Sequence, residues 1–129
     1  MNFALDVETA NNDRGGICQI GVACMRPDNS VETWVTYVDP QTSRWVFTGL
    51  HGISSATVTG APTFAEVLPV LEKGLHGFTD YQDSGFDRSA VRAACDAIHR
   101  PEPQWNWRDS VEPPRICWRL QLLSRPEPS

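Results

Sequence analysis

The sequence has no long apolar run and no paired cysteines, and each absence excludes a class of protein. No apolar segment reaches the ~20 residues that a membrane-spanning helix needs. The N-terminus has no basic segment followed by an apolar one, so we expect no secretory signal. The four cysteines are scattered without a Cys-x-x-Cys pair. This spacing argues against a zinc site and a disulfide scaffold, and it favours a reducing, cytoplasmic location.

The charges are unevenly distributed along the 129 residues, a length that suits one domain with a real core. Up to Asp87 there are eleven acidic residues against four basic ones, and from Arg88 onward seven basic against five acidic. A solvated acidic surface would explain this pattern, and so would a group of acids around a cation. An acidic chain can still act on nucleic acid, because metal ions can supply the positive charge at a phosphate.

The first third of the chain predicts an antiparallel meander of three strands. Residues 2–9, 17–25 and 31–38 are rich in β-branched, aromatic and other apolar side chains. Residues 26–30, Arg-Pro-Asp-Asn-Ser, have the composition of a hairpin turn, because proline fixes φ while Asp and Asn bond back to their own backbone.

The rest of the chain predicts helices and further strands. Thr63 and Glu66 form a capping box at the start of a helix that contains Pro69. A second helix is expected to start at Asp87 as its N-cap, with Phe86 and Val91 as a hydrophobic staple. A short helical turn is expected at 54–58, and strands at 77–82 and 105–111. The fold class is therefore α/β, with one domain over 1–111 and an irregular tail rich in Pro and Arg over 112–129.

Two carboxylates, Asp6 and Glu8, end the first strand. Residues i and i+2 of a strand share a face, ~7 Å apart along the chain, so the two charges repel each other. A divalent ion would resolve this conflict, since hard oxygen ligands suit Mg²⁺ or Mn²⁺. A strand that emerges into solvent would carry the same pair without any function, and Asp-x-Glu alone does not decide between the two.

Four segments in order resemble the DEDDh 3′–5′ exonucleases, the family of the polymerase III ε subunit and ribonuclease T. The resemblance covers Phe3 to about Val111, most of the chain. Its segments are FALDVETAN at the start, CQIGVACM in the second strand, HGISSATVTGAPTFAEVLPVL over residues 51–71, and GFDRSAVRAA over residues 85–94.

The resemblance implies a ribonuclease H-like mixed sheet and two-metal hydrolysis at the 3′ ends of single-stranded DNA or RNA. By match, Asp6, Glu8 and Asp87 are catalytic residues and ligands of a Mg²⁺ or Mn²⁺ pair. For Asp87 a capping role is compatible with metal binding. Two protein partners are open, a DNA polymerase subunit and a second copy of the chain, and no contact with a membrane is expected.

The resemblance also implies a nucleotide-binding segment. His51, Gly52 and Ile53 match the part that packs on the terminal nucleotide, and Thr9 and Ala10 are expected to line the same pocket. Glycine allows close approach to a base or sugar, and isoleucine offers an apolar face. A tight turn with a core isoleucine explains His-Gly-Ile equally well.

Two departures from the family pattern weaken the catalytic prediction. Gln82-Asp83 stands where the family usually carries His-Asn, and no His-x-x-x-x-Asp follows Asp87. The general-base histidine and the fourth acidic ligand are therefore not found, and we expect a domain that is C-terminally truncated or frameshifted relative to its kin. Impaired activity is one consequence. The alternative is a catalytically inactive module that binds nucleic acid or a partner and keeps the exonuclease fold.

Overall fold

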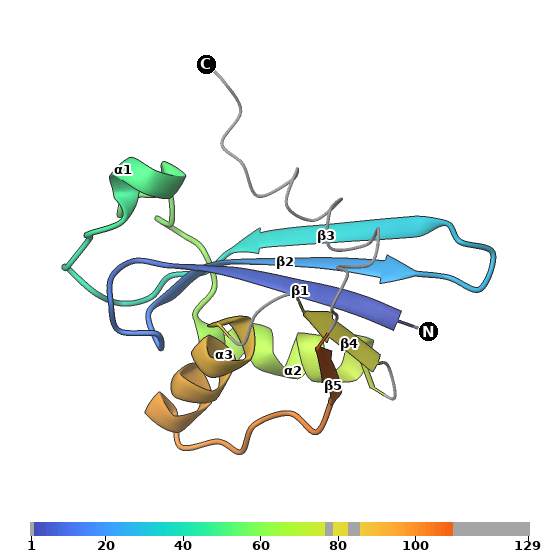
Figure 1. The fold of residues 1–129 in the computed structure, drawn as a ribbon. Coiled ribbons are helices and arrows are strands. Elements are labelled where there is room, and N and C mark those ends of the chain that lie inside the picture. Colours follow the sequence, from blue (N-terminus) through green and yellow to red (C-terminus); the bar gives the residue numbers. More distant parts are fainter. Residues whose placement is uncertain (1, 77–78, 83–85, 110–129) are drawn as a thin grey trace.

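A five-stranded mixed sheet organises the computed structural model, which describes residues 2–76, 79–82 and 86–109 (Figure 1). The strand order is β3-β2-β1-β4-β5. The antiparallel part contains β1 (Asn2–Thr9), β2 (Ile17–Met25) and β3 (Val31–Tyr37). β4 (Thr79–Gln82) pairs parallel with β1, and β5 (Asn106–Asp109) pairs parallel with β4.

The predicted antiparallel meander is confirmed, and so is the predicted hairpin turn at residues 26–30. The carboxylate of Asp28 accepts a hydrogen bond from the backbone N–H of Ser30 at 2.9 Å. Asn29 adopts a left-handed conformation with φ of 68°, which Asn tolerates better than most residues. The strands predicted at 77–82 and 105–111 are present as β4 and β5. Trp105, the first residue of the second predicted strand, lies just before β5, whereas residues 77–78, 110–111 and the tail over 112–129 lie outside the described residues.

Three helices accompany the sheet: α1 (Thr48–His51), α2 (Phe64–Gly74) and α3 (Phe86–Ala97). The predicted capping box is present at the start of α2, and Pro69 lies inside this helix. The helical turn predicted at 54–58 is present as a single turn, because the N–H of Val58 donates to the carbonyl of Ser54 at 3.4 Å, and it does not extend into a helix. The short helix lies earlier, at α1, which the sequence analysis missed. Gly52 ends α1 in a left-handed conformation with φ of 77°.

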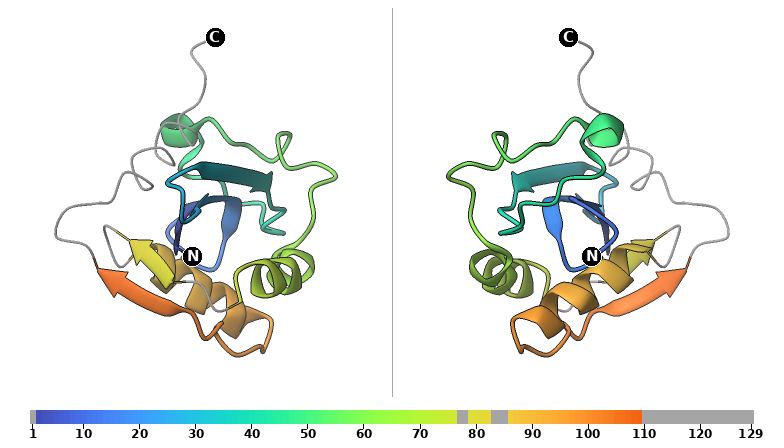
Figure 2. Two further views of the ribbon diagram at one scale, coloured as in Figure 1. Left: turned by 90° about the vertical axis from the view of Figure 1, so that its right-hand side faces the viewer. Right: turned by 90° about the vertical axis from the view of Figure 1, so that its left-hand side faces the viewer.

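The main core lies on one face of the sheet. Phe3, Leu5 and Val7 alternate along β1 and point to the same side, where the apolar stripes of α2 and α3 cover them. Figure 2 shows both helices on this side of the sheet. Phe3 also meets Trp105 edge to face, with ring centroids 5.3 Å apart. The approach to β5 is thereby packed against the first strand.

The opposite face, called here the open face, carries Ala4, Asp6 and Glu8 of β1. Its apolar cluster contains strand residues only within the described part of the chain: Ala4 and Ala23, with Met25 and Val31 packed against them. Among the same residues, none of the helices combines the length and the apolar composition needed to cross a membrane. The acidic pair therefore lies on the face of the sheet that α2 and α3 do not cover.

Leu68 and Val70 allow a direct test of this packing, because they lie on the same helix and differ in burial. Leu68 is fully buried in the main core, whereas Val70 is 59% exposed. We expect Leu68→Ala to lower the free energy of unfolding by about 2–5 kcal/mol, through lost burial and a residual cavity. Val70→Ala should change it by less than about 0.5 kcal/mol. Urea unfolding of both variants measures the difference, and equal losses would contradict this placement of α2.

Candidate metal and nucleotide site

Asp87 joins the start of α3 to the middle of β1. Its Oδ1 atom accepts a hydrogen bond from the backbone N–H of Val7 at 3.0 Å, between residues 80 positions apart in the sequence. The described pairing of β4 with β1 covers only Asn2–Ala4, so Val7 lies beyond it. The carboxylate therefore satisfies a strand N–H that β4 does not reach, and it does so while only 6% exposed.

This arrangement corrects the role predicted for Asp87 within its own helix. α3 spans Phe86–Ala97, so Asp87 is a residue of the first helical turn rather than the N-cap. The predicted staple depended on that cap, so Phe86 and Val91 do not hold its two positions; Val91 is fully buried, and Phe86 is 38% exposed. The sequence alone could not show this, because an Asp at the start of a helix is explained locally by capping.

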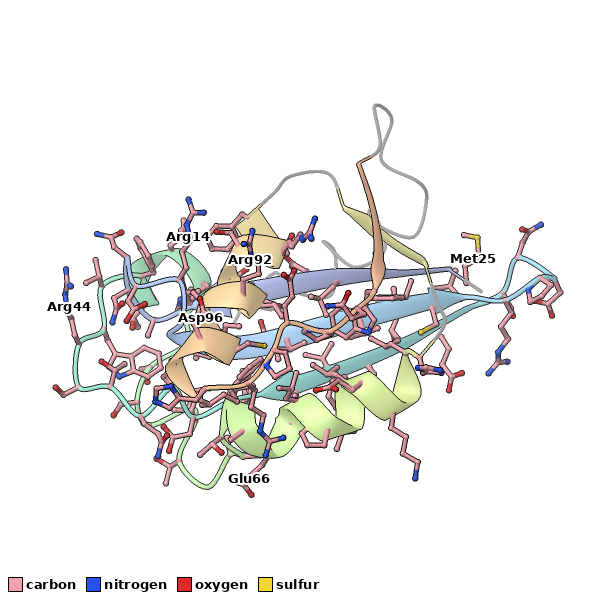
Figure 3. The ribbon with its side chains drawn as sticks, turned by 90° about the horizontal axis from the view of Figure 1, so that it is seen from below. Arg14, Met25, Arg44, Glu66, Arg92 and Asp96 are labelled. Atoms are coloured by element: carbon pink, nitrogen blue, oxygen red, sulfur yellow. The ribbon has the colours of Figure 1, made fainter. Side chains whose placement is uncertain are left out.

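A second contact holds α3 beside β1. Arg14, in the loop that follows β1, donates a hydrogen bond from Nη1 to the Ser89 hydroxyl at 2.6 Å. Its guanidinium carbon also lies 5.6 Å from the ring centroid of Phe86, within cation–π range. Figure 3 shows Arg14 beside the first turns of α3. The loop after the acidic pair and the helix that carries Asp87 are thus linked directly.

Asp6 and Glu8 share the open face, as the strand period predicts. In the antiparallel register Asp6 faces Gly21 and Glu8 faces Gln19. Because Gly21 has no side chain, β2 places no bulk opposite the Asp6 carboxylate. Burial and the neighbouring charge of Asp6 raise the pKa of Glu8 to about 7. The pair is thus held under mutual repulsion, which a cation would relieve.

A β-bulge lies directly behind the acidic pair. The register shifts between Glu8 and Thr9: Glu8 faces Gln19, Thr9 faces Ile17, and Cys18 is the extra residue. Cys18 is fully buried, and burial together with the charge of Glu8 raises the pKa of its thiol to about 12. A bulge bends the strand that contains it and increases the local twist, so the β2 backbone changes direction opposite Glu8 and Thr9. No signal in the sequence pointed to Cys18.

Thr9 and Ala10 lie against the segment around α1. The Nε2 atom of His51 lies 2.9 Å from the carbonyl oxygen of Thr9. The backbone N–H of Ile53 donates to Nδ1 of His51 at 3.1 Å, so Nε2 carries the proton and donates it to Thr9. The carbonyl oxygen of Ala10 accepts the N–H of Val46 at 2.8 Å. The structure therefore brings the predicted nucleotide-binding residues together, although His51 and Thr9 are 42 positions apart in the sequence.

The individual environments of these residues differ. Ile53 is 4% exposed and packs with Cys18 and Val58. It is therefore a core residue, which was one of the two alternatives that the sequence left open. Thr9 is buried and donates its hydroxyl proton to the carbonyl of Asn11 at 3.1 Å. Gly52 is exposed between His51 and Ile53. Contact of any of them with a nucleotide stays a prediction.

Metal binding likewise stays a prediction. Across residues 2–76, 79–82 and 86–109, no three His, Cys, Asp or Glu side chains form a group that could hold a metal ion. Asp6 and Glu8 share a face, and Asp87 reaches the same strand at Val7, from the helix side. The hard oxygen donors fit Mg²⁺ or Mn²⁺ in kind.

One comparison with known proteins gives a result. The chain is similar to the solved structure of exonuclease X in complex with 5′-overhanging duplex DNA, with a TM-score of 0.63 and 22% sequence identity. The similarity covers 83% of this chain and 58% of that one. No family model and no curated protein matches. The comparison shows an exonuclease-like fold, and the chain spans little more than half the length of the protein it resembles.

Asp87→Ala tests the bond to β1. The substitution leaves the buried N–H of Val7 without its acceptor, so we expect a loss of about 1–3 kcal/mol in the free energy of unfolding. Asp87→Asn keeps an amide oxygen at the same place and should lose less. Asp96→Asn, at an exposed position of the same helix, is the control. Amide hydrogen exchange should show faster exchange at Val7 in the alanine variant only, and unchanged protection there would contradict the bond.

The raised pKa of Glu8 predicts a pH dependence of stability. The folded state holds the Glu8 proton up to about pH 7, whereas the unfolded chain releases it near 4.3, so stability falls as pH rises between the two values. Glu8→Gln removes this dependence. Without divalent ions, the variant should gain about 1–2 kcal/mol over the wild type between pH 4.5 and 7.5, after allowance for solvent screening.

Urea unfolding at both pH values, with EDTA present, measures this gain. The control is Glu72→Gln, at an exposed position of α2. A difference between Glu8→Gln and the wild type that does not change with pH would show that Glu8 titrates in its ordinary range.

Proposed function

We propose that this chain is a 3′–5′ exonuclease-type nuclease domain that acts on the 3′ ends of DNA or RNA. The exonuclease-like fold supports this proposal, and so does the bond between Asp87 and Val7. That bond carries the proposal, because it places the third acidic residue at the strand segment that lies between Asp6 and Glu8. The finer assignment, a ribonuclease H-like fold of the polymerase III ε type, is part of the proposal.

In this proposal Asp6, Glu8 and Asp87 hold Mg²⁺ or Mn²⁺. Bound divalent ions supply the activation of water and the stabilisation of the leaving oxygen at the phosphate. The chain's own contribution is to concentrate negative charge on the open face. Burial and the charge of Asp6 disfavour ionised Glu8 and raise its pKa. A cation at this position would favour ionised Glu8 and lower the pKa.

The second element of the proposal is a site for the terminal nucleotide. The hydrogen bond between His51 and Thr9 ties the end of α1 to the residues that follow the acidic pair. Exposed Gly52, without a side chain, leaves room for a sugar or base to approach the backbone. The carbonyl of Thr9 is held by His51, and that of Ala10 by the N–H of Val46. These features orient a nucleotide next to the carboxylates and need no movement of the sheet.

A second function is favoured by a specific observation. Across residues 2–76, 79–82 and 86–109, no three potential ligands form a group that could hold a metal ion. A module that binds nucleic acid or a partner, such as a DNA polymerase subunit, without hydrolysing the ends is therefore the alternative.

Metal binding is tested by thermal unfolding. At pH 7.5, Mn²⁺ at about 100 times its Kd should raise the Tm of the wild type by roughly 5–10 °C, because the ion binds the folded state. Asp6→Ala should abolish the rise, whereas Asp96→Ala, at an exposed position, should keep it. A wild-type Tm that does not respond to Mn²⁺ or Mg²⁺ would overturn the metal site.

A nuclease assay then distinguishes the two functions. Labelled single-stranded DNA and RNA are incubated with the chain and Mn²⁺. Shortening from the 3′ end that disappears in Asp87→Asn supports the exonuclease. Binding of the same strands without shortening, at equal affinity in Asp87→Asn, supports the inactive module. Neither binding nor shortening would contradict the exonuclease and any module that binds nucleic acid, and would favour a module that binds a protein partner.

A further inference from the structure

The loop between β1 and β2, residues 10–16, is held in one shape by its own hydrogen bonds. The N–H of Ala10 donates to the carbonyl of Gly16, and that of Gly16 donates to the carbonyl of Asp13, both at 2.9 Å. The side-chain oxygen of Asn11 accepts the N–H of Asp13 at 2.8 Å. Asn11 is only 5% exposed, and its Nδ2 atom donates to a backbone carbonyl in the segment ahead of α1, at 2.9 Å. The loop is therefore closed locally and anchored to the rest of the chain.

This loop contacts one side of α3 at three positions. Arg14 donates to the Ser89 hydroxyl at 2.6 Å, and its guanidinium carbon lies 5.6 Å from the ring centroid of Phe86. A Cβ atom on Gly15 would lie 3.2 Å from the carbonyl oxygen of Ala93, so the two backbones are in close contact. Residues 86, 89 and 93 share one side of the helix, because they follow its i, i+3, i+7 spacing. The loop thus lies along the first two turns of α3.

Asp87 belongs to the first turn of α3 but reaches a different part of the structure. It follows Phe86 directly, and consecutive residues of a helix lie about 100° apart around the axis. Its carboxylate accepts the N–H of Val7 on β1 at 3.0 Å. The buried apolar residues of α3 begin only at Ala90, so the core packing of this helix starts one turn later. Two polar contacts therefore hold the first turn, one from the loop through Arg14 and one from β1.

We propose that Arg14 is a positioning residue of the candidate site, which holds the first turn of α3 where the Asp87 carboxylate meets β1. Arginine suits this role, because its planar guanidinium can donate to Ser89 from its edge while its flat side covers the ring of Phe86. Lysine has the same charge but no planar group for the second contact. The proposal concerns the placement of Asp87, and only its consequence for metal binding rests on the proposed function.

The charge of Arg14 by itself would have the opposite effect on a metal site. A positive side chain beside the candidate ligands repels Mn²⁺, so its removal should strengthen metal binding. Loss of a positioning residue predicts weaker binding, because a displaced Asp87 carboxylate holds the ion less well. The sign of the change in metal affinity therefore distinguishes the two roles.

Amide hydrogen exchange of the metal-free chain tests the positioning itself. In Arg14→Met, the N–H of Val7 should exchange about 3–10-fold faster relative to the amides of α2, since one hydrogen bond no longer holds the turn that carries its acceptor. Arg14→Lys should lie between this variant and the wild type. Lys73→Met, which removes one positive charge from an exposed position of α2, is the control and should leave Val7 unchanged. Unchanged exchange at Val7 in Arg14→Met would overturn the proposal.

Mn²⁺ titration, followed by the electron paramagnetic resonance signal of the free ion, tests the consequence for the site. At pH 7.5, Arg14→Met and Ser89→Ala should each weaken binding by about 3–10-fold. The double variant should lose little more than Arg14→Met, because both substitutions remove the same hydrogen bond. Arg14→Lys should recover part of the loss, and Lys73→Met should bind as the wild type does. Urea unfolding checks that all variants are folded.

The two measurements separate a failure of this proposal from a failure of the proposed metal site. Equal or tighter Mn²⁺ binding in Arg14→Met would overturn the role of Arg14 in the site. A wild type that does not bind Mn²⁺ would overturn the metal site, whereas faster exchange at Val7 in Arg14→Met would still support the placement of Asp87 by Arg14.

Discussion

The hydrogen bond from Val7 to Asp87 is the constraint on which the arrangement of the site depends. β1 is paired along its length with β2, but its described pairing with β4 ends after three residues. The carboxylate of Asp87 takes over at that point, and α3 is thereby fixed against the middle of β1. The same bond removes a buried unsatisfied N–H, which would be costly in the interior. A single side chain thus links the sheet, the helix and the acidic strand.

The carboxylates of Asp6 and Glu8 repel each other at the end of β1. Asp6 and Glu8 lie on one face of the strand, and the repulsion between them raises the pKa of Glu8 in addition to the effect of burial. Perturbed carboxylates of this kind occur at functional sites more often than elsewhere. The bond between His51 and Thr9 then holds the residue that follows the pair, and a β-bulge at Cys18 lies opposite it in β2.

The two faces of the sheet differ in what covers them. One face is closed by α2 and α3 over the apolar residues of β1 and β2. The other carries the carboxylates and a small apolar cluster of strand residues. At the β3 end of the described sheet, Trp34, Val35 and Tyr37 are partly exposed. Stability therefore comes mainly from the helix side, where the larger apolar cluster lies.

Much of the fold was determined by the sequence itself. The alternation of β1, the turn at Asp28 and Asn29, and the capping box at Thr63 are local signals, and each was found where it was predicted. The shared face of Asp6 and Glu8 also follows from the strand period alone. Local chemistry decides these features, because the residues that interact are neighbours along the chain.

Other features were decided only by tertiary structure. α1 has no capping side chain and no periodic stripe, so its four residues gave no signal. The sequence predicted Asp87 as an N-cap, because its hydrogen bond from the N–H of Val7 joins residues that are distant in the sequence and leaves no local signal. Ile53 became a core residue through contact with Cys18, itself displaced by a bulge that only the pairing of β1 with β2 creates. Long-range pairing is invisible in local pattern, since it depends on which segments the sheet brings together.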